Sequence, residues 1–421
     1  MDLIFAEASP PGRGGVSVIR LSGAGARAML ERFAGRVPEP RKAVLRLIRD
    51  GDEQLDQALV IWFEAGSSFT GEEVAELQLH GVPVVVRRVS AALQAAGCRQ
   101  AEAGEFTRRA YVNGRMDLAA VEGLGDLLEA ETEAQRKLAL QNASGGLSRK
   151  VETWRQMLIR AGALIEVSVD FADEDVPDDV PNEVFHILHQ LRSEFSGEID
   201  GFHAAEHLRK GFEVAVIGPP NAGKSSLINR IAQREVALVS DIAGTTRDII
   251  ELRIDLKGLA VTLLDTAGLR ESDDQIEAMG VDRARNRALT ADLRLHLSST
   301  GQVDDSLWSD GDIAVTTKAD LAAQNTGMAI SSVTGAGINQ LLDELYERLS
   351  LRVSGAGLVS RQRQLSAIRD ARDTLQQVDD LPPEILAELI RQTAVSLDRL
   401  LGRIGAEEYL DVIFSSFCIG K

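Results

Sequence analysis

The sequence has few cysteines, and it lacks a long apolar run. Only two cysteines, Cys98 and Cys418, occur in 421 residues. They exclude a disulfide framework and an all-cysteine zinc site, and they predict a reducing, cytoplasmic location. No apolar run approaches the roughly 18 residues that a membrane helix needs, so we expect no membrane span. The first seven residues also lack the basic-then-apolar order of a signal peptide.

Aromatic residues and positive charge are also scarce. Aromatics make up 4% of the chain against 44% hydrophobic residues, which predicts cores of Leu, Val, Ile and Ala and excludes disorder throughout. The chain has 46 Lys and Arg against 64 Asp and Glu, a formal net charge of −18. This balance excludes a globally basic nucleic-acid coat but leaves room for a local basic patch.

Periodicity divides the chain into four segments, and the length predicts about three domains at roughly 150 residues each. Residues 1–115 alternate short β-type runs with turns and predict an α+β domain. Residues 116–210 and 351–421 show helical spacing, interrupted at 170–183 by an acidic stretch that we expect to be a solvated connection. Residues 211–350 alternate strands and helices, which is typical of a doubly wound α/β domain inserted into a helical one.

A phosphate-binding motif opens the α/β segment. Residues 218–225, GPPNAGKS, fit G-x-x-x-x-G-K-[ST], and they follow a predicted strand and precede a predicted helix. The glycine turn and the helix N-terminus offer backbone N–H groups to phosphate oxygens. We expect Lys224 to reach the β and γ phosphates and the Ser225 hydroxyl to bind Mg²⁺. The predicted cradle comprises Asn221, Ala222, Gly223, Lys224, Ser225 and Ser226.

Two further motifs have the order expected of a nucleotide switch. An apolar strand ends in D-x-x-G at Asp265, Thr266, Ala267 and Gly268, which places Asp265 to hold Mg²⁺ through water. Before it lies the sequence GTTRD at residues 244–248, where a threonine can bind Mg²⁺ only when a γ-phosphate is present. An ordinary polar turn remains the alternative for this second segment.

The base-reading motif departs from the pattern of guanine-specific sites. Such sites have N-K-x-D at a strand end, whereas this chain has Thr317, Lys318, Ala319 and Asp320. Asp320 keeps a carboxylate for the two guanine N–H donors, but the asparagine is absent. The later S-A-K-type loop is also altered, to Ser331, Ser332 and Val333.

The residue that orients the attacking water must also differ from the Ras pattern. Ras-like proteins use a glutamine directly after D-x-x-G, but Leu269 occupies that position here. Glu277 is the candidate replacement. The alternative is that Glu277 is a solvated acid beside Asp273 and Asp274.

Motifs along nearly the whole chain resemble one family, the tRNA-modification GTPases often called MnmE or TrmE. Besides the GTTRD segment, the similarity is carried by residues 10–15, 19–23, 68–72, 103–107, 113–118 and the tail FSSFCIGK at 414–421. The resemblance implies a multidomain α/β fold. An N-terminal α+β domain that binds tetrahydrofolate and forms the homodimer would be joined to a helical domain and an inserted Ras-like P-loop GTPase domain.

The resemblance also implies an activity. Members of this family are potassium-stimulated GTPases that act on tRNA with a flavin-dependent partner protein. They add an aminomethyl or carboxymethylaminomethyl group to C5 of the wobble uridine, using a one-carbon unit from tetrahydrofolate. The competing hypothesis is a GTP-binding regulatory or assembly switch without modification chemistry.

Site residues carried over from the family complete the prediction. Potassium would be held by Asn221, Ser240, Ile242 and Thr245, and Mg²⁺ by Ser225 and Thr246. The nucleotide-contacting loop would comprise Ser240, Asp241, Ile242, Ala243, Gly244, Thr245 and Thr246. Glu277 matches the family's water-orienting glutamate. The folate would meet Arg20, Glu76, Arg115 and Lys421, where Arg115 replaces a common lysine. For Cys418, a role near the modification site and a buried structural role remain equally open.

Overall fold

The computed structural model describes residues 2–170, 180–234, 236–238, 251–265, 285–321, 327–379, 381–405, 410, 413–415, 417 and 420. They form two compact units. The first contains Met1–Gly125, Ala143–Glu152 and Val395–Lys421, and the second contains Asp126–Asn142 and Thr153–Ala394. Across these described ranges, no helix is both long and apolar enough to cross a membrane.

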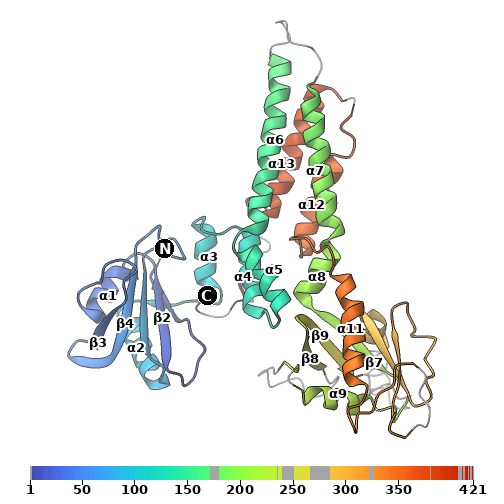
Figure 1. Ribbon diagram of the computed structural model, residues 1–421. Helices are drawn as coiled ribbons and strands as arrows, with labels where there is room; N and C mark the ends of the chain where they lie inside the picture. The colour runs from blue at the N-terminus through green and yellow to red at the C-terminus, as the bar shows by residue number, and fades with distance from the viewer. Residues whose placement is uncertain are drawn as a thin grey trace, which may run out of the picture. The chain divides into compact units, whose positions relative to one another are not determined.

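The first unit is built on a six-stranded sheet in the order β3-β4-β5-β2-β1-β6 (Figure 1). Neighbouring strands are antiparallel except for the parallel pair β1 and β6. The strands are β1 (Ile4–Glu7), β2 (Val16–Ser22), β3 (Val44–Asp50), β4 (Glu53–Phe63), β5 (Val74–His80) and β6 (Arg99–Gln100). Helices α1 (Ala26–Ala34) and α2 (Pro83–Ala95) share one hydrophobic core with the sheet. Alternate residues of β4, such as Val60 and Trp62, are buried, as the two-residue period of a strand requires.

Two short helices follow this sheet along the chain, α3 (Glu105–Val112) and α4 (Leu118–Glu129). Phe414 and Phe417 of the C-terminal segment pack against Val121 of α4 in a small hydrophobic cluster. A side chain at Gly104 would lie 2.5 Å from the Phe414 carbonyl oxygen, so the backbones touch there. The last part of the chain is therefore folded back onto the N-terminal unit.

Long helices dominate the second unit outside its sheet. They are α5 (Glu133–Ala143), α6 (Gly146–Asp170), α7 (Asn182–Asp200), α8 (Phe202–Lys210), α12 (Gln362–Thr374) and α13 (Pro383–Leu400), of which the last residue of α5, the start of α6 and the end of α13 belong to the first unit. Figure 1 shows α7 and α12 side by side, and α13 beside α6. The Trp154 ring meets Phe195 edge-on at 4.9 Å, joining α6 to α7. Most of the acidic stretch expected to be a connection, residues 171–179, lies outside the described residues.

A five-stranded sheet in the order β11-β10-β7-β9-β8 forms the inserted α/β part. Its strands are β7 (Phe212–Ile217), β8 (Glu251–Leu256), β9 (Leu259–Asp265), β10 (Leu293–Ser298) and β11 (Ile313–Thr316). All neighbours are parallel except β8 and β9. Helices α9 (Lys224–Ala232) and α11 (Ile338–Arg352) complete it. The predicted fold class is confirmed: an α+β domain, a helical domain and an inserted Ras-like α/β domain.

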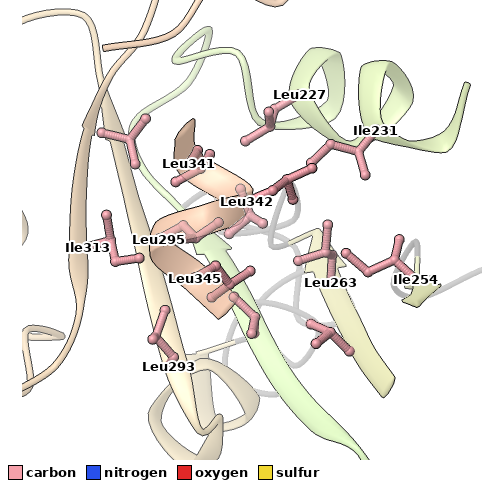
Figure 2. Packing of buried hydrophobic residues seen from close by; sticks show 14 of the residues in the cluster. Leu227, Ile231, Ile254, Leu263, Leu293, Leu295, Ile313, Leu341, Leu342 and Leu345 are labelled. Atoms are coloured by element: carbon pink, nitrogen blue, oxygen red, sulfur yellow. The ribbon is translucent and has the colours of Figure 1, made fainter. Parts of the chain in front are cut away.

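The core of the inserted domain fixes α9 against the sheet. Figure 2 shows Leu227 and Ile231 of α9 around the same apolar space as Leu341 and Leu345 of α11 and Leu263 of β9. Burying each of these side chains stabilises the fold by about 2 kcal/mol. Because α9 begins at Lys224, this packing also holds the end of the phosphate-binding loop in place.

Candidate nucleotide-binding site

The loop between β7 and α9 has a backbone that only certain residues can adopt. Gly218 has φ 150°, and a side chain there would come within 2.1 Å of the Leu297 carbonyl oxygen. Asn221 and Gly223 lie in the left-handed region at φ 59° and 95°. Gly223 is the N-cap of α9, so the N-terminal N–H groups of α9 face the loop. Ala222 is buried in the core, whereas Ser226 is exposed. This is the geometry of an anion cradle.

Lys224 folds back over the loop that it follows. Its Nζ donates to the carbonyl oxygens of Gly218 at 2.7 Å and Pro219 at 3.2 Å. An ammonium group thus lies at the mouth of the cradle, half-buried and held by loop carbonyls. It can exchange these oxygens for phosphate oxygens without moving to another part of the domain.

The next residue connects the cradle to β9. The Ser225 hydroxyl donates to Asp265 Oδ2 over 2.7 Å. Asp265 is 4% exposed, and its Oδ1 is buried without a hydrogen-bond partner in the described part of the chain. A hydroxyl and a carboxylate with an unpaired oxygen are the hard donors that suit Mg²⁺, so the donor set fits this ion.

The predicted base-reading segment lies at the same edge of the sheet. The backbone N–H of Thr317 donates to Ser298 O at 2.9 Å, and that of Ala319 donates to Ile330 O at 3.0 Å. Thr317 Cβ lies 3.9 Å from the point where a Cβ on Gly223 would be, so the segment adjoins the cradle. The Thr317 hydroxyl is buried without a described partner. Lys318 has φ 58°, and both Lys318 and Asp320 are exposed.

The neighbouring loop at residues 331–333 is held by its first serine. Ser331 is fully buried, its Oγ accepts from the Thr334 N–H at 3.2 Å and its carbonyl accepts from Gly335 N at 2.8 Å. Ser332 is half-buried and Val333 is 80% exposed. The predicted phosphate and base segments are therefore brought together at the carboxyl ends of β7, β10 and β11, where ligands bind in open α/β sheets.

The predicted folate residues lie in the other unit. Arg20 of β2 and Glu76 of β5 are cross-strand neighbours, and Arg20 Nε donates to Glu76 Oε1 at 2.9 Å. Arg20 Nη1 also donates to the Gly420 carbonyl at 3.5 Å, and its guanidinium lies 5.8 Å from the Phe106 ring centroid. The C-terminal segment thus reaches the predicted folate pair. Arg115 packs instead against Gly71, and Lys421 lies outside the described residues.

Several predicted residues cannot be placed. The described ranges omit the following: Ser240, Asp241, Ile242, Ala243, Gly244, Thr245, Thr246, Thr266, Ala267, Gly268, Leu269, Glu277 and Cys418. Of the four predicted potassium ligands, the structure therefore places only Asn221. Of the two predicted Mg²⁺ ligands, it places only Ser225.

Sequence reasoning missed a buried charged cluster around Arg109 of α3. Arg109 is 4% exposed and pairs with three carboxylates, those of Asp2, Glu72 and Glu105. Burial alone would raise the pKa of Glu105, but hydrogen bonds, first from Arg99, hold that pKa below its ordinary value. A cavity of about 300 Å³ adjoins the cluster, lined by Asp2, Glu102, Ala103, Glu105, Arg108, Arg109, Val112 and Phe414. The sequence contains no local signal for this cluster, because Asp2 and Arg109 are 107 positions apart.

Comparison with known proteins agrees with the geometry. Residues 3–115 match the family model described as GTP-binding protein TrmE N-terminus, and residues 118–418 match the model described as MnmE helical domain. The chain is 61% identical over 421 residues to the tRNA modification GTPase MnmE of Paracoccus denitrificans, with 100% of both chains covered. It is 50% identical over 429 residues to the MnmE of Dinoroseobacter shibae and 51% identical over 433 residues to that of Roseobacter denitrificans, again with 100% of both chains covered.

Among solved structures, the G domain of the T. maritima FeoB iron transporter is 25% identical. The alignment covers 32% of this chain and 98% of that one at a TM-score of 0.26, which is too low to carry a structural argument. The full-length identities and the two family models show the family of this chain. The chain belongs to the MnmE/TrmE family of tRNA modification GTPases.

Proposed function

We propose that this chain binds GTP with Mg²⁺ and hydrolyses it in the course of tRNA modification. The observation that carries the proposal is the pairing of Ser225 with Asp265 at the start of α9, beside Lys224. This arrangement puts an ammonium group, a hydroxyl and a carboxylate around a helix N-terminus. Those are the groups that a nucleoside triphosphate and its Mg²⁺ require.

Different residues of the chain would bind the phosphates, hold the ions and orient the attacking water. The loop N–H groups and the start of α9 hold the phosphates, and Lys224 leaves the loop carbonyls to contact the β and γ phosphates. Ser225 and Thr246 would hold Mg²⁺, with Asp265 acting through water, and this ion would supply positive charge at the phosphates. Glu277 would orient the attacking water because Leu269 cannot do so. Asn221, Ser240, Ile242 and Thr245 would hold K⁺, which would supply positive charge where negative charge develops between the β and γ phosphates.

Base recognition would come from the two loops beside the cradle. Asp320 accepts from the guanine N–H groups, and residues 317–320 with residues 331–333 surround the base. The segments 240–246 and 265–268 respond to the γ-phosphate. The observation that supports a base site beside the phosphate site is the short distance between Thr317 Cβ and Gly223 of the phosphate-binding loop.

The N-terminal unit would hold a tetrahydrofolate derivative and form a homodimer. Arg20 suits the glutamate tail of a folate, and Glu76 suits the N–H edge of the pterin. Their mutual ion pair at 2.9 Å, with Gly420 close to Arg20, supports a site completed by the tail. Arg115 is added to this site by its match to the family alone. With a flavin-dependent partner, the protein would use the folate carbon to add an aminomethyl or carboxymethylaminomethyl group to C5 of the tRNA wobble uridine in the cytoplasm.

The domain assignment remains part of the same proposal. Residues 1–115 would be the folate-binding and dimerisation domain, 211–350 the G domain, and 116–210 with 351–421 the helical domain. The two ends of the G domain are joined by contacts within the second unit. Arg209, just before it, donates to the carbonyl of Ser360, just after it, at 3.1 Å.

Two measurements test the function. Lys224→Ala should abolish tight GTP binding in an equilibrium titration, whereas Lys257→Ala, which removes a surface ion pair with Asp343 from the same domain, should not. Wild-type affinity in Lys224→Ala would refute the phosphate site. Nucleoside analysis of tRNA from cells lacking the protein separates the enzyme from a regulatory switch, because only the enzyme is needed for the modified wobble uridine.

A further inference from the structure

A buried polar network lies beside the last two strands of the inserted domain. Arg294 and His296 are on β10, and Asp312 immediately precedes β11. Their side chains are 7%, 2% and 1% exposed. The alternate residues of β10, Leu293 and Leu295, belong to the core that β10 shares with α9 and α11 (Figure 2). Because strand side chains alternate, the network occupies the opposite face of the sheet.

Asp312 is the centre of this network. Its Oδ2 accepts from Arg294 Nε at 2.8 Å and from Ser309 N at 2.8 Å, and its Oδ1 accepts from Arg294 N at 2.9 Å. His296 Nε2 lies 3.2 Å from Oδ2. Burial alone would raise the pKa of Asp312, but the hydrogen bonds from Arg294 and Ser309 hold that pKa below its ordinary value. The carboxylate is therefore ionised at neutral pH.

Arg294 and His296 make further contacts that hold them in place. Arg294 Nη1 donates to the carbonyls of Ala288 and Leu289 at 3.1 Å each. The His296 ring lies 4.8 Å from the Trp308 ring, and burial lowers the pKa of His296, which keeps the ring neutral. A buried ion pair of this kind contributes little net stability compared with a well-packed apolar cluster. Such a pair can instead fix the geometry of the segments that it joins.

The network holds the connection between β10 and β11. Parallel strands are usually joined through a helix that packs on the sheet, but residues 299–312, all of them described, contain none. The bonds between Asp312 and Ser309, one in each direction, close the end of this connection. The Asp312 network thus takes over the anchoring that a crossover helix would provide.

The base-reading segment depends on this anchor. β11 is an edge strand of four residues that leads directly into Thr317. Among the described residues, its backbone pairing is with β10 and with an isolated bridge from Thr316 to Ala329. β10 touches both halves of the site. Its Leu297 carbonyl adjoins Gly218 of the phosphate loop, and its Ser298 carbonyl accepts from Thr317 N. The offset between phosphate loop and base loop is therefore set by the register of β10 and β11.

We propose that Asp312, held by Arg294 and His296, positions the base-reading segment against the phosphate loop and so sets the guanine selectivity of the site. The proposal rests on the nucleotide-binding function proposed above. None of the three residues touches the nucleotide; they act through Thr317 and Asp320. The absence of asparagine at position 317 increases the need for such an anchor, because the Thr317 hydroxyl makes no described bond to the loop.

The test measures selectivity in the full-length protein. GDP and inosine diphosphate, which lacks the exocyclic amine of guanine, are titrated by calorimetry into wild type and Asp312→Asn. A displaced Asp320 loses its bond to the amine, which is worth a factor of about ten, so the preference for GDP should fall by roughly that factor. His296→Leu should lower the preference too, whereas His296→Gln keeps a neutral donor toward Asp312 and should preserve it.

Asp292→Asn is the matched control. The Asp292 carboxylate accepts from Glu213 N at 2.7 Å and so anchors a strand at the opposite end of β10. This variant should keep the wild-type preference even if its melting temperature falls. If Asp312→Asn does not fold by circular dichroism, His296→Leu decides the question.

The outcomes separate the two proposals. A wild-type protein that does not bind GDP refutes the nucleotide-binding function itself. A selective wild type whose preference survives both Asp312→Asn and His296→Leu overturns the positioning role alone. Equal losses of preference in Asp312→Asn and Asp292→Asn also overturn it, because they show a general loosening of the domain.

Discussion

The Ser225 hydroxyl donates to the Asp265 carboxylate over 2.7 Å and so joins the start of α9 to the end of β9. These residues are 40 positions apart, and they belong to two different phosphate-site motifs. The bond brings the two motifs into one site. It also leaves Asp265 Oδ1 buried and without a hydrogen-bond partner in the described structure. A buried oxygen of this kind needs a further polar group as its partner.

Ser225→Ala should therefore weaken GTP binding mainly when Mg²⁺ is present. The substitution removes a metal ligand but leaves Lys224 and the loop N–H groups, so binding in EDTA should change little. We expect a loss of about tenfold or more with Mg²⁺, since a bond to a charged group is worth roughly 1.5–3 kcal/mol. Titrations with and without Mg²⁺ measure the difference. A similar loss in both conditions would show that Ser225 contacts the phosphates directly.

Thr317→Asn should tighten GTP binding and increase the preference for GTP over ATP. The asparagine amide supplies an N–H donor and greater reach, whereas the threonine hydroxyl is buried without a described partner. Competition between the two nucleotides in mutant and parent gives the answer. If both discriminate alike, residues 317–320 do not read the base.

The strand, loop and helix around the phosphate-binding motif could be predicted because the motif is a short contiguous run with its own chemistry. The network around Asp312 could not. The alternation Leu-Arg-Leu-His-Leu-Ser in β10 is the pattern of a strand with one face in water, yet all six residues are buried. Only the tertiary register places Asp312, 18 positions from Arg294, against this polar face. The same limit applies to the contact between Gly420 and Arg20, which spans 400 positions.

Arg20→Ala and Glu76→Ala should each weaken binding of a reduced folate while leaving GTP hydrolysis nearly intact. The two residues form one ion pair, so removing either leaves the other charge partly buried and misplaced. Calorimetry with a tetrahydrofolate derivative measures the loss. Arg46→Ala, which changes a half-buried arginine of β3 in the same sheet, is the matched control. Absence of folate binding to the wild-type protein would remove the folate site from the proposal.

Potassium should stimulate hydrolysis more than sodium at equal ionic strength. The sequence motifs indicate no arginine finger, so another group must neutralise the charge that builds between the β and γ phosphates. Asn221, which is exposed in the phosphate-binding loop with φ 59°, is the one proposed potassium ligand among the described residues. Several carbonyl and hydroxyl oxygens, here those of Ser240, Ile242 and Thr245, would complete a site of potassium's size.

Asn221→Ala should therefore abolish the difference between the two salts, measured as the GTPase rate with Mg²⁺ present. Glu277→Ala should behave differently, because it removes the water-orienting carboxylate and leaves the cation site intact. It should slow hydrolysis, whereas the pairing of two G domains, which we expect potassium to promote, should persist in sedimentation experiments. Equal wild-type rates in potassium and sodium would refute the cation mechanism. A Glu277→Ala variant that hydrolyses GTP at the wild-type rate would instead refute the role of Glu277 and leave the cation mechanism standing.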